Sequence, residues 1–273
     1  MSTLLSEAGI RETLAETARE QLDELVVLDI VPSTNNWLLE QKRPAIGRFK
    51  AVLAEQQTAG RGRHGKRWAS PRDTGLYLSV GYTFRRTPDD LACMTLAAGV
   101  ATLQALELIG AERLGLKWPN DIFAKDAKLG GILVDAQTGR GGHVSIVCGI
   151  GINVDLTLIG QQCTGPANAD YEITDLKSHC GNLPARSATA GTIIRHVMQA
   201  ISVFETNGLG PFRADWKKYD WLKGKPVDVD MPGEEFEGVA DGIDEHGALH
   251  VRTPQGMRVV HTGTVRARKD NRA

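Results

Sequence analysis

Basic side chains and glycines alternate at residues 60–68, in the sequence GRGRHGKRW, and this pattern suits chemistry on an anion. The basic residues and the glycines between them are Arg61, Arg63, Lys66 and Arg67, and Gly60, Gly62 and Gly65. A guanidinium offers a planar fork of donors to a phosphate or carboxylate, and glycines let the backbone approach that anion closely. The spacing matches neither of the standard phosphate or dinucleotide loops, and a solvated basic loop is the alternative. Trp68 directly after it is expected either to pack on an adenine or close over an apolar ligand, or to anchor the core.

A second group of polar residues, LKWPND, ends at Asp121. A lysine, an amide and a carboxylate beside a proline suit a nucleotide or a magnesium ion, although Pro-Asn-Asp is also ordinary turn chemistry. Seven residues on, Lys128 precedes a glycine pair and an apolar strand, where an ammonium group is well placed to stabilise a phosphoryl group, although a lone lysine is usually exposed. In GIGIN, which ends at Asn153, two glycines suit a ligand that lies against strand backbone, or else a bulge.

Several classes of protein are disfavoured by composition. The 32 Lys and Arg against 33 Asp and Glu leave a net charge of −1, which removes any whole-chain argument for nucleic acid or membrane binding. The four cysteines show no C-x-x-C spacing, His64 has no suitably spaced triad partners, and no metal-ligand motif is found, so no protein metal site is predicted. The N-terminus has no signal-peptide pattern, and no run of 18 apolar residues spans a membrane. We therefore expect a cytoplasmic globular protein.

Hydrophobic periodicity predicts a mixed α/β domain followed by a small β module. Helices are expected at 3–24, 91–109 and 189–207, and strands at 25–31, 50–57, 76–84, 131–137 and 143–154. Ser33 is placed to cap a helix that follows the first strand. Residues 155–188 are expected to form a mobile excursion. Four short strands at 227–231, 236–243, 248–253 and 258–261 suggest a small barrel, which gives two domains at residues 1–222 and 223–273.

Taken in order, the motifs resemble those of the biotin–protein ligase family. They are STN after a strand, AEQQTAGRGRHGKRW, LKWPND, KLGGILVD and GIGIN, and the resemblance covers residues 25–265. It implies an α+β fold, with a catalytic domain like class II aminoacyl-tRNA synthetases (a mixed sheet flanked by helices) and a C-terminal SH3-like barrel. It also implies that biotin reacts with ATP and Mg²⁺ to form biotinyl-5′-AMP. A lysine of the biotin carboxyl carrier protein of acetyl-CoA carboxylase then takes the biotinyl group.

The resemblance also assigns site residues. Lys128 and Arg63 are implied as the catalytic pair. Biotin and biotinyl-AMP contacts are implied for Ser33, Thr34, Asn35, Gln57, Gly60, Arg61, Gly62, Arg63, Lys128, Gly131, Leu133 and Gly149. Nucleotide contacts are implied for Trp68, Asn120, Asp121 and Asn153.

Some positions depart from the family pattern. Lys66 stands where arginine is frequent, Gly130 where alanine is usual, and Asp135 where glutamate is usual. About 25 residues precede the first predicted strand, so we expect a form without the DNA-binding domain of many bacterial members, and no specific DNA binding. A lipoate–protein ligase and, less favoured, a biotin-sensing repressor are the alternatives. A homodimer is left open.

Overall fold

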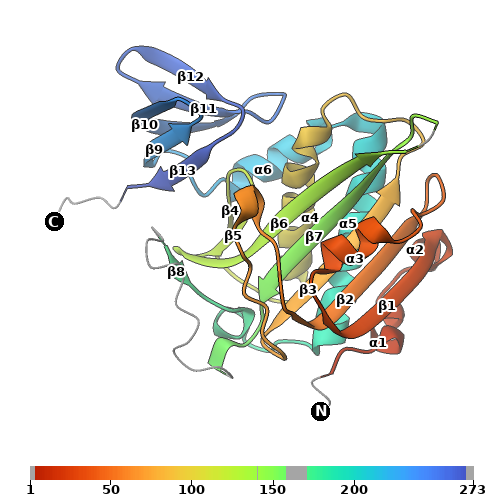
Figure 1. The fold of residues 1–273 in the computed structure, drawn as a ribbon. Helices are drawn as coiled ribbons and strands as arrows, with labels where there is room; N and C mark the ends of the chain where they lie inside the picture. The colour runs from red at the N-terminus through yellow and green to blue at the C-terminus, as the bar shows by residue number, and fades with distance from the viewer. Residues whose placement is uncertain (1–3, 140, 158–170, 269–273) are drawn as a thin grey trace.

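The computed structural model describes residues 4–139, 141–157 and 171–268. Within them, a mixed eight-stranded sheet has the order β1-β2-β3-β7-β6-β5-β4, with β8 paired to β6 (Figure 1). Its strands are β1 Leu22–Val31, β2 Phe49–Gln57, β3 Gly75–Thr83, β4 Leu114–Lys117, β5 Asp121–Ala124, β6 Ala127–Thr138, β7 Val144–Asn153 and β8 Glu172–Ile173. β1 is parallel to β2 and β8 is parallel to β6, whereas the other neighbours are antiparallel.

Helices cover both faces of this sheet (Figure 1). α4 (Met94–Leu108) and α5 (Arg186–Asn207) pack together and enclose the main core against one face. α3 (Thr34–Glu40) lies on the other face, where Leu38 meets Val52 and Val147. Successive strand residues face opposite sides of a sheet, so each of these strands contributes side chains to the packing on both faces. The stretch Leu91–Leu108 is apolar and long enough to cross a membrane, but 67% of it is buried inside the fold, as a core helix requires.

The single helix expected at 3–24 is wrong, because the described part forms two short helices and the start of a strand. α1 (Glu7–Glu12) is capped by Ser6 and ends at Thr13, whose hydroxyl donates to the Ile10 carbonyl at 2.8 Å. α2 (Glu16–Gln21) follows, and Leu22 already pairs with β2. The apolar residues that recur every three or four positions are nevertheless buried. The periodicity therefore identified the buried face correctly, but not the points where the helix is interrupted and the strand begins.

The other long predicted elements are confirmed with small shifts of their ends, and Ser33 caps α3 as expected. Four elements were not predicted: β4, β5, β13 (Thr264–Ala267) and α6 (Arg213–Tyr219). They have four to seven residues each, too few to show a clear period. The basic loop also contains a short 3₁₀ turn at Arg63–Gly65. The predicted excursion lies partly outside the described residues, at 158–170; its described remainder holds β8 and a 3₁₀ turn at Leu176–Ser178.

A separate antiparallel sheet of five strands ends the described chain, in the order β12-β11-β10-β9-β13. The other four strands are β9 Pro226–Met231, β10 Glu234–Ile243, β11 Leu249–Thr253 and β12 Gly256–Val260. Apolar side chains of this sheet, such as Val229 and Leu249, belong to the same buried cluster as the core of the large sheet. The C-terminal sheet is therefore packed onto the large sheet's domain and can contribute to a site there.

Candidate active site

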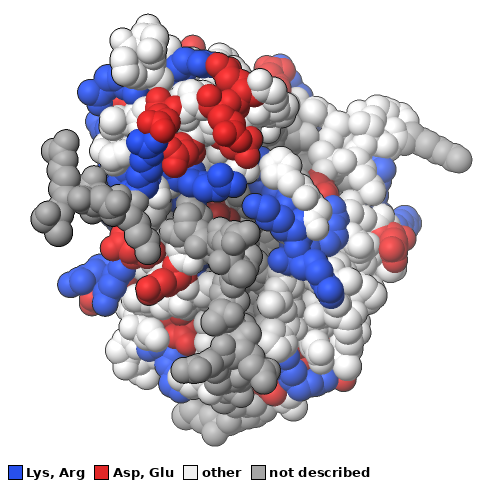
Figure 2. All heavy atoms as spheres, turned by 60° about the vertical axis from the view of Figure 1, so that its left-hand side comes forward, with Lys and Arg blue, Asp and Glu red and all other residues white. Residues whose placement is uncertain are grey.

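A cleft of about 1110 Å³ brings together most of the predicted site residues. It is lined by the start of α3, the end of β2, the basic loop, β3, β6, β7 and β13 at one edge of the C-terminal sheet. The basic residues that line it are Arg61, Arg63, Lys66, Arg67, Lys117, Lys128 and Arg266. Figure 2 shows lysine and arginine side chains gathered along a hollow in this face. The cleft thus offers positive charge to an anionic ligand although the whole chain is nearly neutral.

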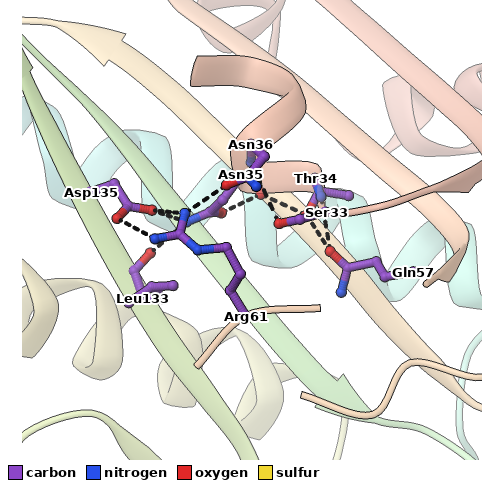
Figure 3. A network of polar contacts seen from close by, with 9 residues as sticks. Ser33, Thr34, Asn35, Asn36, Gln57, Arg61, Leu133 and Asp135 are labelled. Atoms are coloured by element: carbon purple, nitrogen blue, oxygen red, sulfur yellow. Dashed lines mark hydrogen bonds and ion pairs between the residues drawn. The ribbon is translucent and has the colours of Figure 1, made fainter. Parts of the chain in front are cut away.

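One end of the cleft is a buried polar pocket built around α3 (Figure 3). The Gln57 side-chain carbonyl accepts from the Thr34 backbone N–H at 2.9 Å, and the Gln57 amide donates to Ser70 at 2.8 Å. The Ser79 hydroxyl donates to the Asn35 side-chain oxygen at 2.6 Å, and its oxygen lies within hydrogen-bond distance of the Thr34 hydroxyl, at 2.8 Å. Such a network fixes each side chain in one rotamer, so the pocket is preorganised for a polar ligand group.

Gly149 is needed for this pocket to form. A Cβ atom at this position would lie 2.0 Å from the Asn35 side-chain oxygen, a distance no real Cβ contact shows. The Asn35 amide in turn donates to Asp135 at 2.8 Å and to the Leu133 carbonyl at 3.2 Å. The absent side chain on β7 therefore lets α3 sit against the sheet.

The two arginines of the GRGR sequence make different contacts. Arg61 donates from both terminal nitrogens to the Asp135 carboxylate, at 3.1 and 3.2 Å, and to Asn36 at 2.8 Å (Figure 3). Arg63 is half-buried and approaches the Asn120 side-chain oxygen at 3.5 Å. Burial lowers the pKa of Arg63 and the nearby Asp121 carboxylate opposes that shift, but a guanidinium keeps its charge at neutral pH.

Lys128 lies at the centre of the cleft. Its ammonium group is 2.6 Å from the Asp121 carboxylate and lies over the rings of Trp68 and Tyr171, at 5.6 and 5.2 Å from their centroids. Burial alone would lower the pKa of Lys128, but Asp121 and then Tyr171 outweigh it and raise that pKa above its ordinary value. Lys128 is therefore a protonated, fixed positive charge at neutral pH.

Asn120, Asn153 and Trp68 line the same cleft as this lysine. The Asn120 amide donates to the Ile132 carbonyl at 2.9 Å, and the Asn153 amide donates to the Thr174 carbonyl at 2.9 Å. The Trp68 ring lies on the glycine surface of β7, where a Cβ on Gly151 would be 2.6 Å from its indole nitrogen. Its indole N–H is buried and has no partner among the residues described. Trp68 thus packs on the sheet and also lines the cleft, and its contact with an adenine stays a prediction.

The remaining predicted site residues also line the cavities. Gly62, Gly131 and Leu133 border the cleft, whereas Gly60 lines a smaller hollow on the outer side of the basic loop. Sequence reasoning missed Ser70, Ser79, Tyr171, Thr264 and Arg266 as neighbours of the site. Tyr171 and Arg266 carry no recognisable motif, and only the fold brings them to the cleft.

The part of the chain that the structure describes contains no cluster of three or more His, Cys, Asp or Glu side chains able to hold a metal ion. The cleft itself offers fixed positive charges, polar side chains and strand backbone to a ligand.

Comparison with known proteins fits this arrangement. Residues 27–153 match the model of the biotin/lipoate A/B protein ligase family, and residues 223–266 match that of the biotin protein ligase C-terminal domain. The chain is 34% identical over 234 residues to the bifunctional ligase/repressor BirA of Escherichia coli, covering 84% of this chain and 70% of that protein. It is 32% identical over 269 residues to the biotin–[acetyl-CoA-carboxylase] ligase of Mycobacterium tuberculosis, covering 96% of this chain and 95% of that protein.

A solved structure is similar over nearly the same span. The biotin protein ligase of Aquifex aeolicus, in complex with biotin and ATP, superposes with a TM-score of 0.73 at 25% identity and covers 90% of this chain and 100% of that one. The large sheet and its cleft thus define a ligase of the biotin and lipoate type. With the matching C-terminal domain and the M. tuberculosis relative, the chain belongs to the biotin protein ligases.

Proposed function

We propose that this chain activates biotin with ATP and transfers the biotinyl group to a lysine of the biotin carboxyl carrier protein of acetyl-CoA carboxylase. The observation that carries the proposal is the placement of Lys128 and Arg63 beside the buried pocket of Thr34, Asn35 and Gln57, in one cleft large enough for both substrates. The membership of the biotin protein ligases and the names of the relatives support the choice of biotin and of the carrier.

The reaction needs two steps. A biotin carboxylate oxygen attacks the α-phosphorus of ATP, the bond to the leaving pyrophosphate breaks, and biotinyl-5′-AMP remains. The carrier lysine, as a neutral amine, then attacks the acyl carbon, AMP leaves with the electron pair of the broken C–O bond, and the amide nitrogen loses a proton. Two anions must meet in the first step, so fixed positive charge lowers the barrier by bringing them together and stabilising the transition state.

The contacts suggest a division of roles between residues. Ser33, Thr34, Asn35 and Gln57 supply the donors and acceptors that a ureido ring requires, and Gly131, Leu133 and Gly149 form the wall beside them. Lys128 and Arg63 face the reacting carboxylate and α-phosphate. Trp68, Asn120, Asp121 and Asn153 lie on the nucleotide side, and Gly60, Arg61 and Gly62 form the loop that covers the intermediate.

Magnesium fits this cleft as an ion that arrives with ATP. Mg²⁺ is usually held by one or two carboxylates together with substrate phosphates, rather than by a cage of protein ligands. The Asp121 carboxylate and the Asn120 side-chain oxygen are the donors available for it. When bound, the ion would neutralise charge on the phosphates, while the residues of this chain orient the carboxylate and exclude water.

The domain boundary at 222/223 is also part of the proposal. β9 to β13 pair with one another, and the C-terminal family match begins at residue 223. We assign the first domain to the class II aminoacyl-tRNA synthetase type and the second to the SH3-like type, and we place the reaction in the cytoplasm, where the carrier is made.

The test is pyrophosphate release from ATP with biotin, lipoate or octanoate offered separately. We expect release with biotin, followed by labelling of the carrier domain. The matched model for residues 27–153 groups biotin with lipoate ligases, so lipoate is the informative competitor. Release driven by lipoate and not by biotin would overturn the assignment.

A further inference from the structure

A tight turn of the C-terminal sheet, Asp244–Gly247, reaches into the large domain at the start of α4. The Asp244 carboxylate accepts from the backbone N–H groups of His246 and Ala248, both at 2.9 Å, which fixes the turn. Gly247 has a φ of 74°, which a residue with a side chain rarely adopts. A Cβ there would also lie 2.7 Å from Leu96 and 2.9 Å from the Cys93 sulfur. The turn therefore packs closely against Leu96 and Cys93, with no room for a side chain at Gly247.

Two side chains of the large domain hold the carbonyls of this turn. The Trp118 indole N–H donates to the Gly247 carbonyl at 2.9 Å in a buried contact. The Cys93 thiol donates to the His246 carbonyl at 2.8 Å. Burial, with Asp90 and Asp244 nearby, raises the pKa of Cys93 to about 11, so the thiol keeps its proton at neutral pH.

Trp118 belongs to the turn that forms the nucleotide side of the cleft. It is 4% exposed and stands between Lys117 and the Pro119-Asn120-Asp121 segment. Asp121 holds Lys128 at 2.6 Å, and the Asn120 carbonyl accepts from the Ile132 backbone N–H at 2.9 Å. A displacement of Trp118 would therefore carry these groups away from the reacting atoms.

We propose that Trp118 is a positioning residue through which the C-terminal sheet sets the geometry of the nucleotide side of the active site. The proposal rests on the proposed function and deepens it, since it makes ATP use depend on one contact between the two sheets. Biotin recognition does not depend on that contact, because the α3 pocket is held by its own hydrogen bonds to β2, β3 and β6.

The experiment compares two tryptophan-to-phenylalanine variants. Trp118→Phe removes the N–H donor and leaves the Gly247 carbonyl buried without it. Trp216→Phe is the matched control, because Trp216 in α6 is 2% exposed and its indole N–H has no partner among the residues described. Biotin-dependent ATP–pyrophosphate exchange gives kcat and KM for ATP, and calorimetry without ATP gives the dissociation constant of biotin.

We expect Trp118→Phe to lower kcat/KM for ATP about tenfold, from the cost of a buried unpaired carbonyl, with the biotin dissociation constant within about twofold of wild type. Trp216→Phe should leave both near wild type. Gly247→Ala disturbs the same contact from the C-terminal sheet and should also lower kcat/KM for ATP. Because both changes act on one contact, the double variant should lower kcat/KM by less than the two single effects combined.

Two results would overturn the proposal. In one, Trp118→Phe keeps the ATP kinetics of Trp216→Phe. In the other, biotin binding weakens as much as ATP use, which indicates general loosening. Failure of the proposed function has a different signature: the wild type itself would show no biotin-dependent exchange, and this proposal would fall with it.

Discussion

Arg61 and Arg63 look alike in the GRGR sequence, but their surroundings separate them. The planar fork of Arg61 is directed at the Asp135 carboxylate, where it completes the pocket wall. Arg63 has no carboxylate hydrogen bond of this kind among the described contacts and lies on the nucleotide side, near Asn120 and Asp121. We therefore expect a phosphate to meet Arg63 and Lys128, whereas Arg61 supports the pocket around α3.

Lys128→Ala should abolish adenylate formation while biotin binding stays measurable. The ammonium group acts on charge that develops at the phosphoryl group, a contribution on the order of 3 kcal/mol by analogy with oxyanion donors, or about a hundredfold in rate. Biotin-dependent pyrophosphate exchange measures the loss, and calorimetry measures biotin affinity. Lys177→Ala, at an exposed surface pair, is the control. Exchange at the wild-type rate would remove Lys128 from the mechanism.

Asp121→Asn should move the alkaline limit of activity to lower pH. Burial lowers the pKa of Lys128, and the Asp121 charge more than offsets that effect. Without the charge, burial dominates, the pKa of Lys128 falls, and the active protonated form is lost earlier as the pH rises. The measurement is kcat/KM for ATP between about pH 7 and pH 10. An unmoved alkaline limb would show that a group other than Lys128 sets it.

At the scale of elements, hydrophobic periodicity predicted the long helices and strands and missed the short ones. β2, β3, β7, α4 and α5 are long enough for their buried faces to repeat. β4 and β5 have four residues each, too few to show a period, so no strand is predicted on either side of the Pro-Asn-Asp segment. β4 pairs with β5, and β5 pairs with β6, through contacts that no local sequence pattern records.

The residues of the candidate site also divide into those that the sequence predicted and those that it did not. Residues inside recognisable motifs, such as Gln57, Lys128 and Gly149, were predicted, and they line the cleft. Tyr171 and Arg266 were not, because each lies in a segment without a recognisable motif that tertiary packing alone brings to the cleft. Ser79 on β3 and Asp135 on β6 complete the pocket around α3, and alternation in a strand does not say which side chain meets a ligand.

The basic loop is a compact element with its own hydrogen bonds. The Gly62 N–H donates to the Lys66 carbonyl at 2.7 Å and the Trp68 N–H donates to the Gly60 carbonyl at 2.9 Å, which closes it on itself. A loop tied at its base in this way can move as a unit, so we expect Arg63 to reach the phosphate as the loop covers the cleft.

Arg63→Gly should release the mixed anhydride. Charge-assisted hydrogen bonds from Arg63 to the phosphate, each worth about 1.5–3 kcal/mol, lengthen the residence of biotinyl-AMP, and glycine also makes the loop more costly to order. Biotin and ATP should still react, more slowly, and the escaped adenylate should acylate lysines on a bystander such as albumin, detected by a biotin blot. Lys66→Gly, at an exposed position of the same loop, is the control. Unlabelled albumin while adenylate is still made would show that Arg63 does not retain the intermediate.

At the scale of the whole molecule, distant parts of the chain meet at a buried ion cluster beneath the large sheet. Arg186 at the start of α5 lies 2.8 Å from Glu55 on β2 and 3.3 Å from Asp73 before β3. Glu55 also accepts from the Leu5 backbone N–H at 2.6 Å. The side chains of Arg186 and Glu55 are only 7% and 5% exposed, so their charges are screened little by water. One arginine thus ties the N-terminal segment, two strands and the longest described helix together.

Arg186→Met should therefore destabilise the whole fold. Removing one partner leaves the Glu55 carboxylate buried without its main counter-charge, at a cost of about 3–5 kcal/mol in the free energy of unfolding. Adding Glu55→Gln to that variant should recover most of the loss, because a neutral amide needs no counter-charge. Arg258→Met breaks the Arg258–Glu234 pair on the C-terminal sheet, which is solvent-exposed, and should leave the urea midpoint unchanged. Urea unfolding at neutral pH measures all three variants. If Arg186→Met unfolds at the midpoint of Arg258→Met, or if Glu55→Gln brings no recovery, the cluster is not what holds these segments together.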